Sequence, residues 1–558
     1  MKKYWQQHKI LLALTLCIGI IGAVCNAFIA IVLQKIIDAA VSGEGAVFMK
    51  TVVFTVVYVA VLCLLSYLGA LASKYLLLNM SRQLRQDVFY GILRRRPMQF
   101  WQVDTADYTS ALTNDIRMLE ENYILTVLNT IELVALFFAT LMILLYLSPL
   151  VTMILLFNLA LIFLIPALFG RLLEKRQAAI SKQQAVYTAT LQDIFLGYDV
   201  VRSYGIRPQM EQRFKRENEK TVQRRFAADR MFALNDGLSE TMSTLSIVVV
   251  IAVSAYLVLR GNITMGTLLA LTQLSGTFMA PVMMLLQNIP KISSMKPVIA
   301  RLQELADGKV ESWSGTGQPS FQQTVELQNI SFAYDEAVPV LKNITLCFKQ
   351  GKKYALLGPS GCGKTTLIKL LSGYSNGYTG KILYDGQELR TLSDVELTQL
   401  FSLVHQNVYL FSGSVRDNIT LGEDFSEEQL RQAIADSGAD TFVYQLPQGL
   451  DTDAGENGSN LSGGQRQRIG LARAFLRQTH FIVLDEGTSA VDKRTAAEIE
   501  NRLLRRENLT LLTITHTLQP ELLRQYDEII YLEQGCVLGQ GSYDELATKN
   551  SRFQAFIQ

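Results

Sequence analysis

The chain has 558 residues, of which 49% are hydrophobic and 18% are charged, and its formal net charge at pH 7 is +2. This length is too great for a single hydrophobic core and predicts several domains. The near-neutral charge argues against a nucleic-acid-binding protein, because no basic surplus remains to pair with phosphates. Most of the apolar residues precede residue 300, and such concentrated hydrophobicity is typical of membrane spans.

Six segments of the first half are long and apolar enough to cross a bilayer about 30 Å thick. They lie near residues 10–33, 51–78, 124–147, 149–170, 243–259 and 264–289. The connections from Ser81 to Asn122 and from Arg171 to Arg230 are rich in arginine, whereas the other connections between spans hold few basic residues. By the positive-inside rule, both termini and the two basic connections face the cytoplasm. The sequence therefore predicts an all-α, six-helix transmembrane domain over residues 1–306.

A turn-rich linker and a second domain with a different pattern follow the spans. Residues 307–322 are rich in Gly and Ser and include Pro319, as expected of a linker. From residue 323 to residue 558, short β-branched strands alternate with amphipathic helices, which is typical of an α/β domain. We therefore expect a helical membrane domain followed by a cytoplasmic α/β domain.

A glycine-rich loop indicates the chemistry of the second domain. It fits the pattern G-x-x-x-x-G-K-[ST], follows an apolar strand and opens a helix, so it predicts a P-loop NTPase. The glycines let backbone N–H groups wrap phosphate oxygens, the lysine adds a positive charge, and the first threonine offers a hydroxyl to Mg²⁺. The residues predicted to bind the nucleotide here are Gly358, Pro359, Ser360, Gly361, Cys362, Gly363, Lys364, Thr365 and Thr366.

Two carboxylates follow a second apolar strand, which runs from Phe481 to Leu484. Asp485 is well placed to hold Mg²⁺, and Glu486 to orient or deprotonate the attacking water. An acidic pair after a strand is usually a helix cap. Beside a phosphate loop, however, the catalytic interpretation is favoured.

Between these two elements the chain reads Leu461-Ser462-Gly463-Gly464-Gln465. This run resembles the signature sequence of ATP-binding cassette (ABC) proteins, and it is far more specific than the phosphate loop. The resemblance implies that Ser462, Gly463, Gly464 and Gln465 contact the nucleotide.

Other motifs of the ABC family follow in the family's order, over about residues 330–548. Tyr334 resembles the aromatic residue that stacks on adenine. Gln406 matches the glutamine that contacts Mg²⁺ and senses the membrane domain, and His516 resembles the switch histidine. The resemblance implies ATP and Mg²⁺ as cofactors, with Glu486, His516 and Gln406 as catalytic residues and Thr365, Gln406 and Asp485 as metal ligands.

The membrane half resembles the exporter class of this family, which has six spans in each chain. In that class, short helices at the tips of the cytoplasmic loops dock on the ATPase domains, and we expect them near residues 102–109 and 203–210. The resemblance implies alternating access, in which two ATPase domains close head to tail on two ATP molecules. It also implies a multi-pass protein of the plasma membrane, bacterial inner or cell membrane, with the ATPase domain in the cytoplasm.

The partner and the substrate remain open at this point. The chain carries every catalytic element, which favours a homodimer, but a heterodimer with a second half-transporter remains an alternative. We expect export of an amphiphilic substrate, such as a drug, a lipid or a peptide. Two alternatives are an importer with the exporter fold, as in metal-chelate uptake, and a regulatory membrane ATPase that transports nothing.

Three residues within the spans are candidates for substrate contact. Glu132 places a carboxylate in the third span with no Lys or Arg in that segment, and such groups usually face the interior of the helix bundle with a partner. Met279 and Met283 lie in the sixth span, where methionine side chains form adaptable apolar walls. Core packing is the competing interpretation for the methionines, and a satisfied buried acid is the competing one for Glu132.

Overall fold

The computed structural model describes residues 1–307, 315–334, 338–485, 493–515 and 518–557. The chain divides into two compact units. The helical unit comprises Met1–Leu93 and Ala106–Asp307, and the α/β unit comprises Arg94–Thr105 and Gly308–Gln558. The short segment Arg94–Thr105 thus belongs to the α/β unit, although the helical unit flanks it on both sides in sequence.

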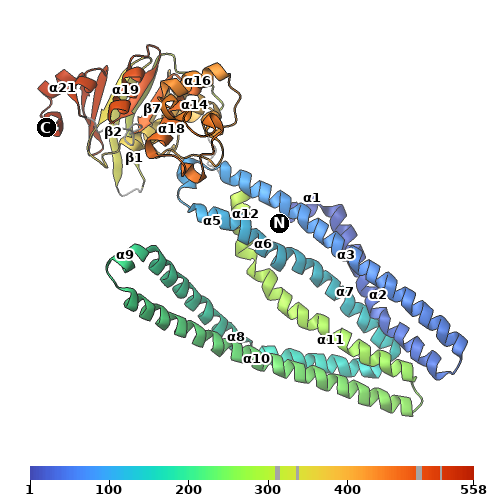
Figure 1. The fold of residues 1–558 in the computed structure, drawn as a ribbon. Coiled ribbons are helices and arrows are strands. Elements are labelled where there is room, and N and C mark those ends of the chain that lie inside the picture. Colours follow the sequence, from blue (N-terminus) through green and yellow to red (C-terminus); the bar gives the residue numbers. More distant parts are fainter. Residues whose placement is uncertain (308–314, 335–337, 486–492, 516–517, 558) are drawn as a thin grey trace. The chain divides into compact units, whose positions relative to one another are not determined.

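Long helices form the helical unit (Figure 1). Ser148 and Pro149 form the tight turn between α7 and α8, where the Ser148 hydroxyl accepts a hydrogen bond from the Val151 amide and proline occupies the first turn. The elements of this unit are α1 Lys2–Gln7, α2 Lys9–Val41, α3 Gly45–Leu93, α5 Thr105–Ser110, the π-helical segment η1 Ala111–Asp115, α6 Ile116–Leu119, the π-helical segment η2 Glu120–Ile124, α7 Leu125–Leu147, α8 Pro149–Leu196, α9 Tyr198–Ser203, α10 Arg207–Leu259, α11 Met265–Ser294 and α12 Lys296–Asp307.

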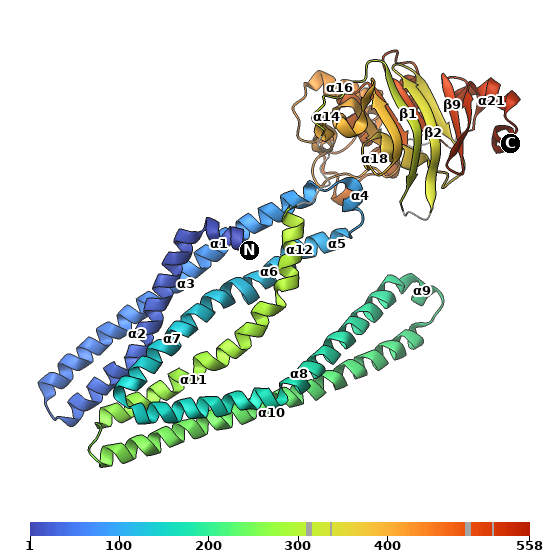
Figure 2. The ribbon, with the colours of Figure 1, turned by 180° about the vertical axis from the view of Figure 1, so that it is seen from behind.

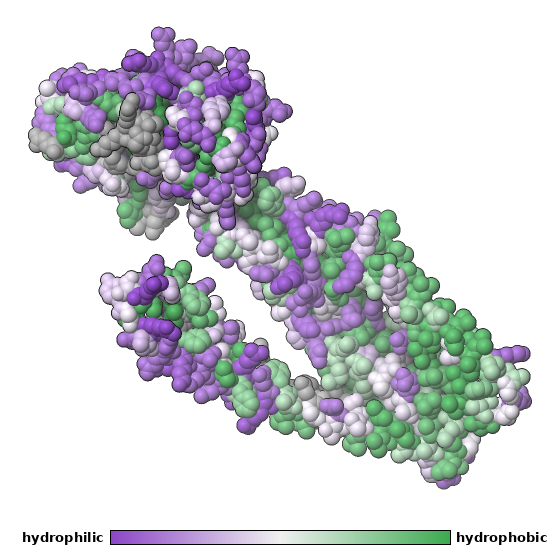
Figure 3. Space-filling view, in the orientation of Figure 1, coloured by the Kyte–Doolittle hydropathy of each residue, from purple (hydrophilic) through white to green (hydrophobic). Residues whose placement is uncertain are grey.

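In the described part of the chain, five helical stretches are long and apolar enough to cross a membrane. They are Lys9–Val41, Gly45–Leu93, Thr105–Leu147, Glu240–Leu259 and Met265–Asp307. The shorter apolar stretch Pro149–Leu161 opens α8, where the sequence predicts the fourth span, and the side chains of residues 162–174 are outside the description. Figure 3 shows apolar side chains gathered on the outer surface of α2 and α3. An apolar surface of this extent is stable in lipid rather than in water.

Ion pairs and one close backbone approach join the ends of the helices that are predicted to be cytoplasmic. Asp115 in η1 accepts a hydrogen bond from Arg301 of α12 at 3.2 Å. Glu120 in η2 accepts one from Arg85 of α3 at 3.1 Å. Gly91 of α3 lies so close to α12 that a Cβ atom there would be 2.0 Å from the carbonyl oxygen of Leu305. These contacts hold α3, α12 and the two π-helical segments together.

Two sheets form the core of the α/β unit (Figure 2). The four-stranded sheet has the order β2-β1-β4-β5 and is antiparallel. The six-stranded sheet has the order β10-β9-β3-β8-β7-β6 and is parallel except for β10. The strands are β1 Thr324–Ala333, β2 Pro339–Lys349, β3 Lys353–Leu357, β4 Thr379–Tyr384, β5 Gln387–Glu388, β6 Phe401–Val404, β7 Phe481–Asp485, β8 Thr510–Ile514, β9 Glu528–Glu533 and β10 Cys536–Gly541.

The central strands β3 and β8 are buried along their whole length, as expected of parallel strands covered on both faces. Successive residues of β7 enter different hydrophobic clusters: Ile482 and Leu484 enter one, Phe481 and Val483 the other. The helices of this unit are α4 Pro97–Phe100, α13 Lys364–Leu371, η3 Leu389–Thr391, α14 Asp394–Leu400, α15 Val415–Thr420, α16 Glu427–Asp436, α17 Asp440–Val443, η4 Gly449–Asp451, η5 Glu456–Gly458, α18 Gly463–Leu476, α19 Lys493–Leu504, α20 Pro520–Leu523, α21 Tyr543–Lys549 and α22 Ser551–Ile557.

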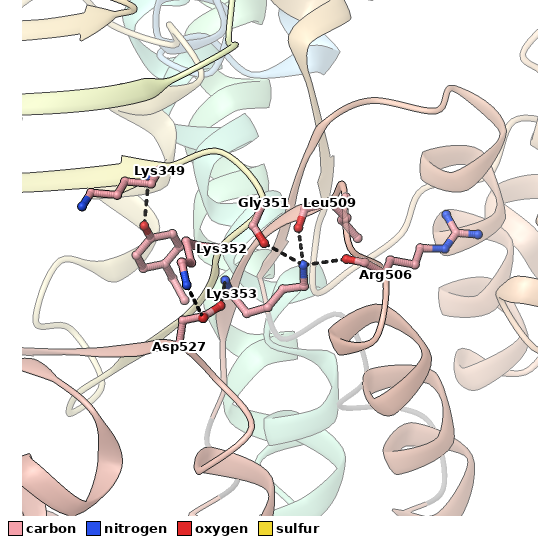
Figure 4. Close-up of polar contacts among 8 residues, drawn as sticks. Lys349, Gly351, Lys352, Lys353, Arg506, Leu509 and Asp527 are labelled. Carbon is pink, nitrogen blue, oxygen red and sulfur yellow. Dashed lines mark hydrogen bonds and ion pairs between the residues drawn. The ribbon is translucent and has the colours of Figure 1, made fainter.

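A buried lysine anchors the start of β3 (Figure 4). The ammonium group of Lys353 donates hydrogen bonds to the carbonyl oxygens of Gly351 at 3.1 Å, Arg506 at 2.8 Å and Leu509. The Lys353 amide donates to the Asp527 carboxylate at 2.8 Å. Burial lowers the pKa of Lys353, and the three carbonyl groups compensate for the lost hydration of the ammonium. The strand that leads into the glycine-rich loop is therefore fixed at its far end.

Candidate nucleotide site

The candidate site lies at the edge of the six-stranded sheet where the parallel strands end. Asp485 of β7 pairs with Ile514 of β8, and Ile514 pairs with Leu356 of β3. Residues that follow these positions emerge at the same edge, which is where open α/β sheets bind ligands. The glycine-rich loop follows β3, and Gln406 follows β6, the neighbour of β7. The fold thus gathers motifs that are far apart in the sequence.

The conformation of the loop depends on its glycines. Gly358, Gly361 and Gly363 have φ angles of +154°, +78° and +107°, which side chains rarely adopt. A Cβ atom on Gly358 would also lie 2.0 Å from the carbonyl oxygen of Leu532. The buried Lys364 ammonium donates to the carbonyl oxygens of Gly358 at 2.7 Å and Pro359 at 3.0 Å, so its charge lies inside the loop.

Cys362 and Ser360 belong to the same loop but differ in exposure. Cys362 is buried, with its Sγ 4.0 Å from the Lys364 ammonium, whereas Ser360 is exposed. Burial raises the pKa of the Cys362 thiol, and the charge of Lys364 partly opposes this shift. At neutral pH the thiol is therefore uncharged and acts as a packing group within the loop.

The oxygen donors expected for Mg²⁺ lie at this sheet edge. Thr365 and Gln406 are exposed, and Asp485 ends β7. Val404 of β6 pairs with Leu484 of β7, so the ends of these two strands lie next to each other. Hydroxyl, carboxamide and carboxylate oxygens are ligands that Mg²⁺ prefers, and these residues therefore fit the ion.

A cavity of about 350 Å³ adjoins the loop beside Tyr334. The Tyr334 side chain is 51% exposed, and its hydroxyl lies 3.2 Å from Thr366 Oγ1. Its ring meets Phe332 edge to face, with the centroids 5.1 Å apart. Met98 and Trp101 line the same cavity from the segment Arg94–Thr105. Motif reasoning missed these two residues, although the Phe100-Trp101 pair within a polar connection was a usable signal.

The signature residues begin α18. Ser462 caps the helix, since its hydroxyl accepts from the Gln465 amide at 3.3 Å while Gln465 Oε1 accepts from the Ser462 amide at 2.8 Å. Ser462 is exposed, and Gly463 and Gly464 are the first residues of the helix. The buried Gln467 donates to the Gln406 carbonyl oxygen at 3.2 Å and joins α18 to the loop after β6. Exposed N–H groups at a helix start bind anions well.

Two predicted catalytic residues, Glu486 and His516, lie outside the described residues. In sequence, Glu486 directly follows the last residue of β7, and His516 is the second residue after β8.

In the two connections that are predicted to be cytoplasmic, the short helices are α4, α5 and α9. Most of α5 lies within the predicted range 102–109, and α9 ends at the first residue of the predicted range 203–210. Pro97 occupies the first turn of α4, where its missing N–H costs nothing. After α9 the chain turns at Gly205, whose φ is +65°. The second predicted range also contains the beginning of α10, at Arg207.

The candidate substrate residues have different surroundings in the helical unit. Met279 is buried and Met283 is partly buried, and both pack in a hydrophobic cluster with Phe278. Glu132 is only half-buried and lines a cavity between α2, α3 and α7.

A helical unit with membrane-spanning helices, fused to an α/β unit that carries a phosphate loop and a signature helix, defines the class of ATP-driven transporter subunits. Models of known families agree with this class. The model of the ABC transporter transmembrane region matches residues 12–282, and the model described as ABC transporter matches residues 341–489.

Individual relatives support the same family. The ATP-dependent lipid A-core flippase of Syntrophus aciditrophicus (strain SB) is 31% identical over 404 residues, which cover 70% of this chain and 66% of the relative. The β-(1→2)glucan export ATP-binding/permease protein NdvA of Rhizobium johnstonii is 30% identical over 400 residues, or 70% of this chain and 68% of the relative. The solved structure of a bacterial Atm1-family ABC exporter with ATP bound has the same fold, with a TM-score of 0.81 over 98% of both chains at 21% identity.

The chain therefore belongs to the ABC transporter family, as an exporter-type half-transporter in which one membrane domain is fused to one ATPase domain. This confirms the predicted family and fold class. It is a multi-pass membrane protein whose ATPase domain drives transport.

Proposed function

We propose that two copies of this chain form a transporter that uses ATP and Mg²⁺ to move an amphiphilic substrate out of the cytoplasm across a bacterial cell membrane. One observation carries the proposal. The phosphate loop, Gln406 and Asp485 meet at one sheet edge in a chain whose other unit has the length and hydrophobicity of membrane spans.

Each residue of the nucleotide site has a distinct task in this proposal. The Tyr334 ring stacks on adenine, while the loop amides and the Lys364 ammonium bind the phosphates. The residues that would hold Mg²⁺ are Thr365, Gln406 and Asp485, and the ion would neutralise charge on the phosphate oxygens. Glu486 accepts a proton from the attacking water, and His516 donates a hydrogen bond to the γ-phosphate.

The exposed start of α18 completes the site of the partner subunit. Ser462 and the amides of Gly463 and Gly464 bind the γ-phosphate held by the phosphate loop of the other copy. Because each copy supplies both a loop and a signature, two equivalent sites form. A single chain that holds every element needs no different partner, so the homodimer is favoured over a heterodimer.

The second cytoplasmic loop supplies a further argument for two copies. The α8–α10 hairpin ends in α9, with Leu196 just before it and Tyr204 just after it; these two residues are 89% and 78% exposed. The α/β unit carries a groove of about 430 Å³ whose rim includes Tyr409 and Phe411, which are 56% and 60% exposed. Apolar and aromatic groups of this size are seldom left in water in such numbers. We propose that α9 of one copy covers this groove on the other copy.

Hydrogen bonds hold the rim of this groove in place. Arg473 lines it and donates to the carbonyl oxygens of Tyr409 at 2.8 Å and Asn418. Burial lowers the pKa of Arg473 to about 10, so the guanidinium remains charged at neutral pH. These bonds fix the rim against α15 and α18, and closure of the two ATPase domains then pulls on the long helices of the membrane domain.

The substrate class rests on the membrane domain and on the variety of relatives. The relatives' names mention lipid A-core and β-(1→2)glucan, so the family fold accepts amphiphilic and polar cargo alike. The packing of Met279 and Met283 within a hydrophobic cluster favours a structural role for both. Of the three candidate residues, Glu132 is the one that we propose to contact the substrate.

Glu486→Gln tests the catalytic assignment. The variant keeps the shape of the side chain but removes the proton acceptor, so ATP hydrolysis should fall by about 10²–10⁴-fold while ATP binding persists. The measurement is phosphate release and ATP retention by the full chain in lipid nanodiscs. Glu428→Gln, at an exposed position of α16, is the control and should hydrolyse ATP at the wild-type rate. Near wild-type turnover of Glu486→Gln would contradict the assignment.

A further inference from the structure

A cavity lined by both apolar and polar side chains lies within the membrane-spanning part of the helical unit. Its volume is about 320 Å³, and it is lined by α2, α3 and α7. The three helices lie side by side, with α2 packed against both of the others (Figure 2). Positions 19, 22, 23 and 26 of α2, 66, 69, 70 and 73 of α3, and 129, 132, 133 and 136 of α7 line it. On every helix these positions form one face.

Small residues create the space. A Cβ atom on Gly22 would meet no atom within 4 Å, so this glycine opens onto empty volume. Gly19 has a different role, because a Cβ atom there would lie 2.3 Å from Glu132 Oε1. The Glu132 side chain therefore crosses the surface of α2 at Gly19 and lies against the cavity.

Glu132 brings the only charged side chain of α7 to this cavity. No hydrogen bond or ion pair joins its carboxylate to any residue that the structure describes, and no Lys, Arg or His lines the cavity. Its neighbour Asn129, in contrast, accepts a hydrogen bond from Asn288 at 3.3 Å. A carboxylate within a membrane span is costly without a partner. The described residues thus provide the negative group and the space, but not the cation.

The lining indicates which cation fits. The lining holds a single carboxylate, and the described residues contain no group of three or more His, Cys, Asp or Glu side chains that could hold a metal ion. An ammonium group needs three acceptors, and the oxygens of Glu132, Asn26 and Ser66 are available in the lining. Leu65 and Leu136 form apolar walls beside them. We propose that this cavity binds the ammonium group of an amphiphilic amine, with Glu132 as its counter-ion.

Two kinds of amphiphilic molecule carry such an ammonium group: an aminophospholipid, in its headgroup, and a free amphiphilic amine. One consequence of this proposal, that the bound amine is transported, rests on the proposed function. Binding itself requires neither ATP nor transport. A binding measurement without nucleotide therefore tests the site separately from the ATPase, and a failure of the Glu486 experiment would not affect it.

The experiment measures the thermal unfolding midpoint of the full chain in phosphatidylcholine nanodiscs with increasing decylamine, with decanol as the uncharged probe. Decylamine should raise the midpoint more than decanol. Glu132→Gln keeps the shape of the side chain and removes the charge, so it should weaken the decylamine response at least about tenfold. Gly22→Leu places a side chain in the cavity from a position where a Cβ atom would meet no atom within 4 Å, and it should have the same effect. Gly237→Leu, at another open helical position, should respond like the wild type.

A second set of nanodiscs contains phosphatidylethanolamine. A higher midpoint there for the wild type, but not for Glu132→Gln, identifies the lipid headgroup as the source of the ammonium. An unchanged midpoint with a persisting decylamine response identifies the free amine. Equal responses to decylamine and decanol, or an undiminished decylamine response in Glu132→Gln, overturn the proposal.

Discussion

Asp385 shows how one carboxylate fixes the entry to the α/β unit. Its oxygens accept hydrogen bonds from the Ser320 hydroxyl at 2.9 Å and from the amides of Gln322, Gln323 and Thr324 at 2.7 to 2.9 Å. Burial alone would raise its pKa, but these donors outweigh burial and lower the pKa below 3.8. The segment before β1 is thereby held against the turn that follows β4.

Asp385→Asn should therefore destabilise the α/β unit, because its amide group faces N–H donors. The expected cost is about 1–3 kcal/mol at pH 7. Since the folded pKa is depressed, this contribution is fully present above the unfolded value of 3.8 and is lost as the pH falls through the folded pKa. The difference in unfolding midpoint between wild type and variant should therefore shrink below about pH 4. Asp424→Asn, at an exposed position, is the control, and a pH-independent difference would contradict the argument.

The sequence predicts the phosphate loop because the backbone of the loop requires glycine where φ is positive. The spacing of the glycines in the sequence shows this requirement. The structure places those glycines as the pattern requires. Trp101 and Met98 beside Tyr334 could not be predicted in this way, because they are more than 200 positions away in sequence. Their position depends on a segment of the first loop that folds with the α/β unit.

At the scale of elements, the length and hydrophobicity of the spans were predictable because lipid imposes both. The ends of the loop helices were not, since turn residues rather than periodicity decide them. α4 begins at Pro97, and Gly205 lies in the turn after α9.

The close approach of α3 and α12 leads to a test at this scale. Gly91→Val should force the helices apart, because a Cβ atom would lie 2.0 Å from the Leu305 carbonyl oxygen, a backbone atom that cannot rotate away. α12 is the last helix before the α/β unit in sequence, so we expect a lower unfolding midpoint and weaker stimulation of ATPase activity by substrate. Decylamine is the added substrate both when the unfolding midpoint and when the ATPase stimulation is measured. Gly45→Val in the same helix has open space and should behave like wild type; equal behaviour of the two variants would contradict the argument.

At the scale of the whole molecule, the proposed docking of α9 on the partner subunit's groove can be tested directly. One chain carries Tyr204→Cys and one tag, and a co-expressed chain carries Phe411→Cys and a second tag. Mild oxidation should join the two tags, because a disulfide needs Cα atoms within about 7 Å. Pairing Tyr204→Cys with Glu428→Cys is the control and should give no such product. Absence of a two-tag product from the Tyr204–Phe411 pair would contradict docking between copies.

The two π-helical segments, η1 and η2, change the direction in which the residues of the third span face. An α-helix turns about 100° per residue, and a π-helical turn accommodates one extra residue. Each segment therefore rotates all the residues that follow it by about 100° around the helix axis, relative to an uninterrupted α-helix. Because the two segments follow one another, α7 turns nearly the opposite face toward its neighbours from the face that an uninterrupted α-helix from α5 would present. The direction in which Glu132 faces is thus set by two insertions near Asp115 and Glu120, which lie outside the apolar span itself.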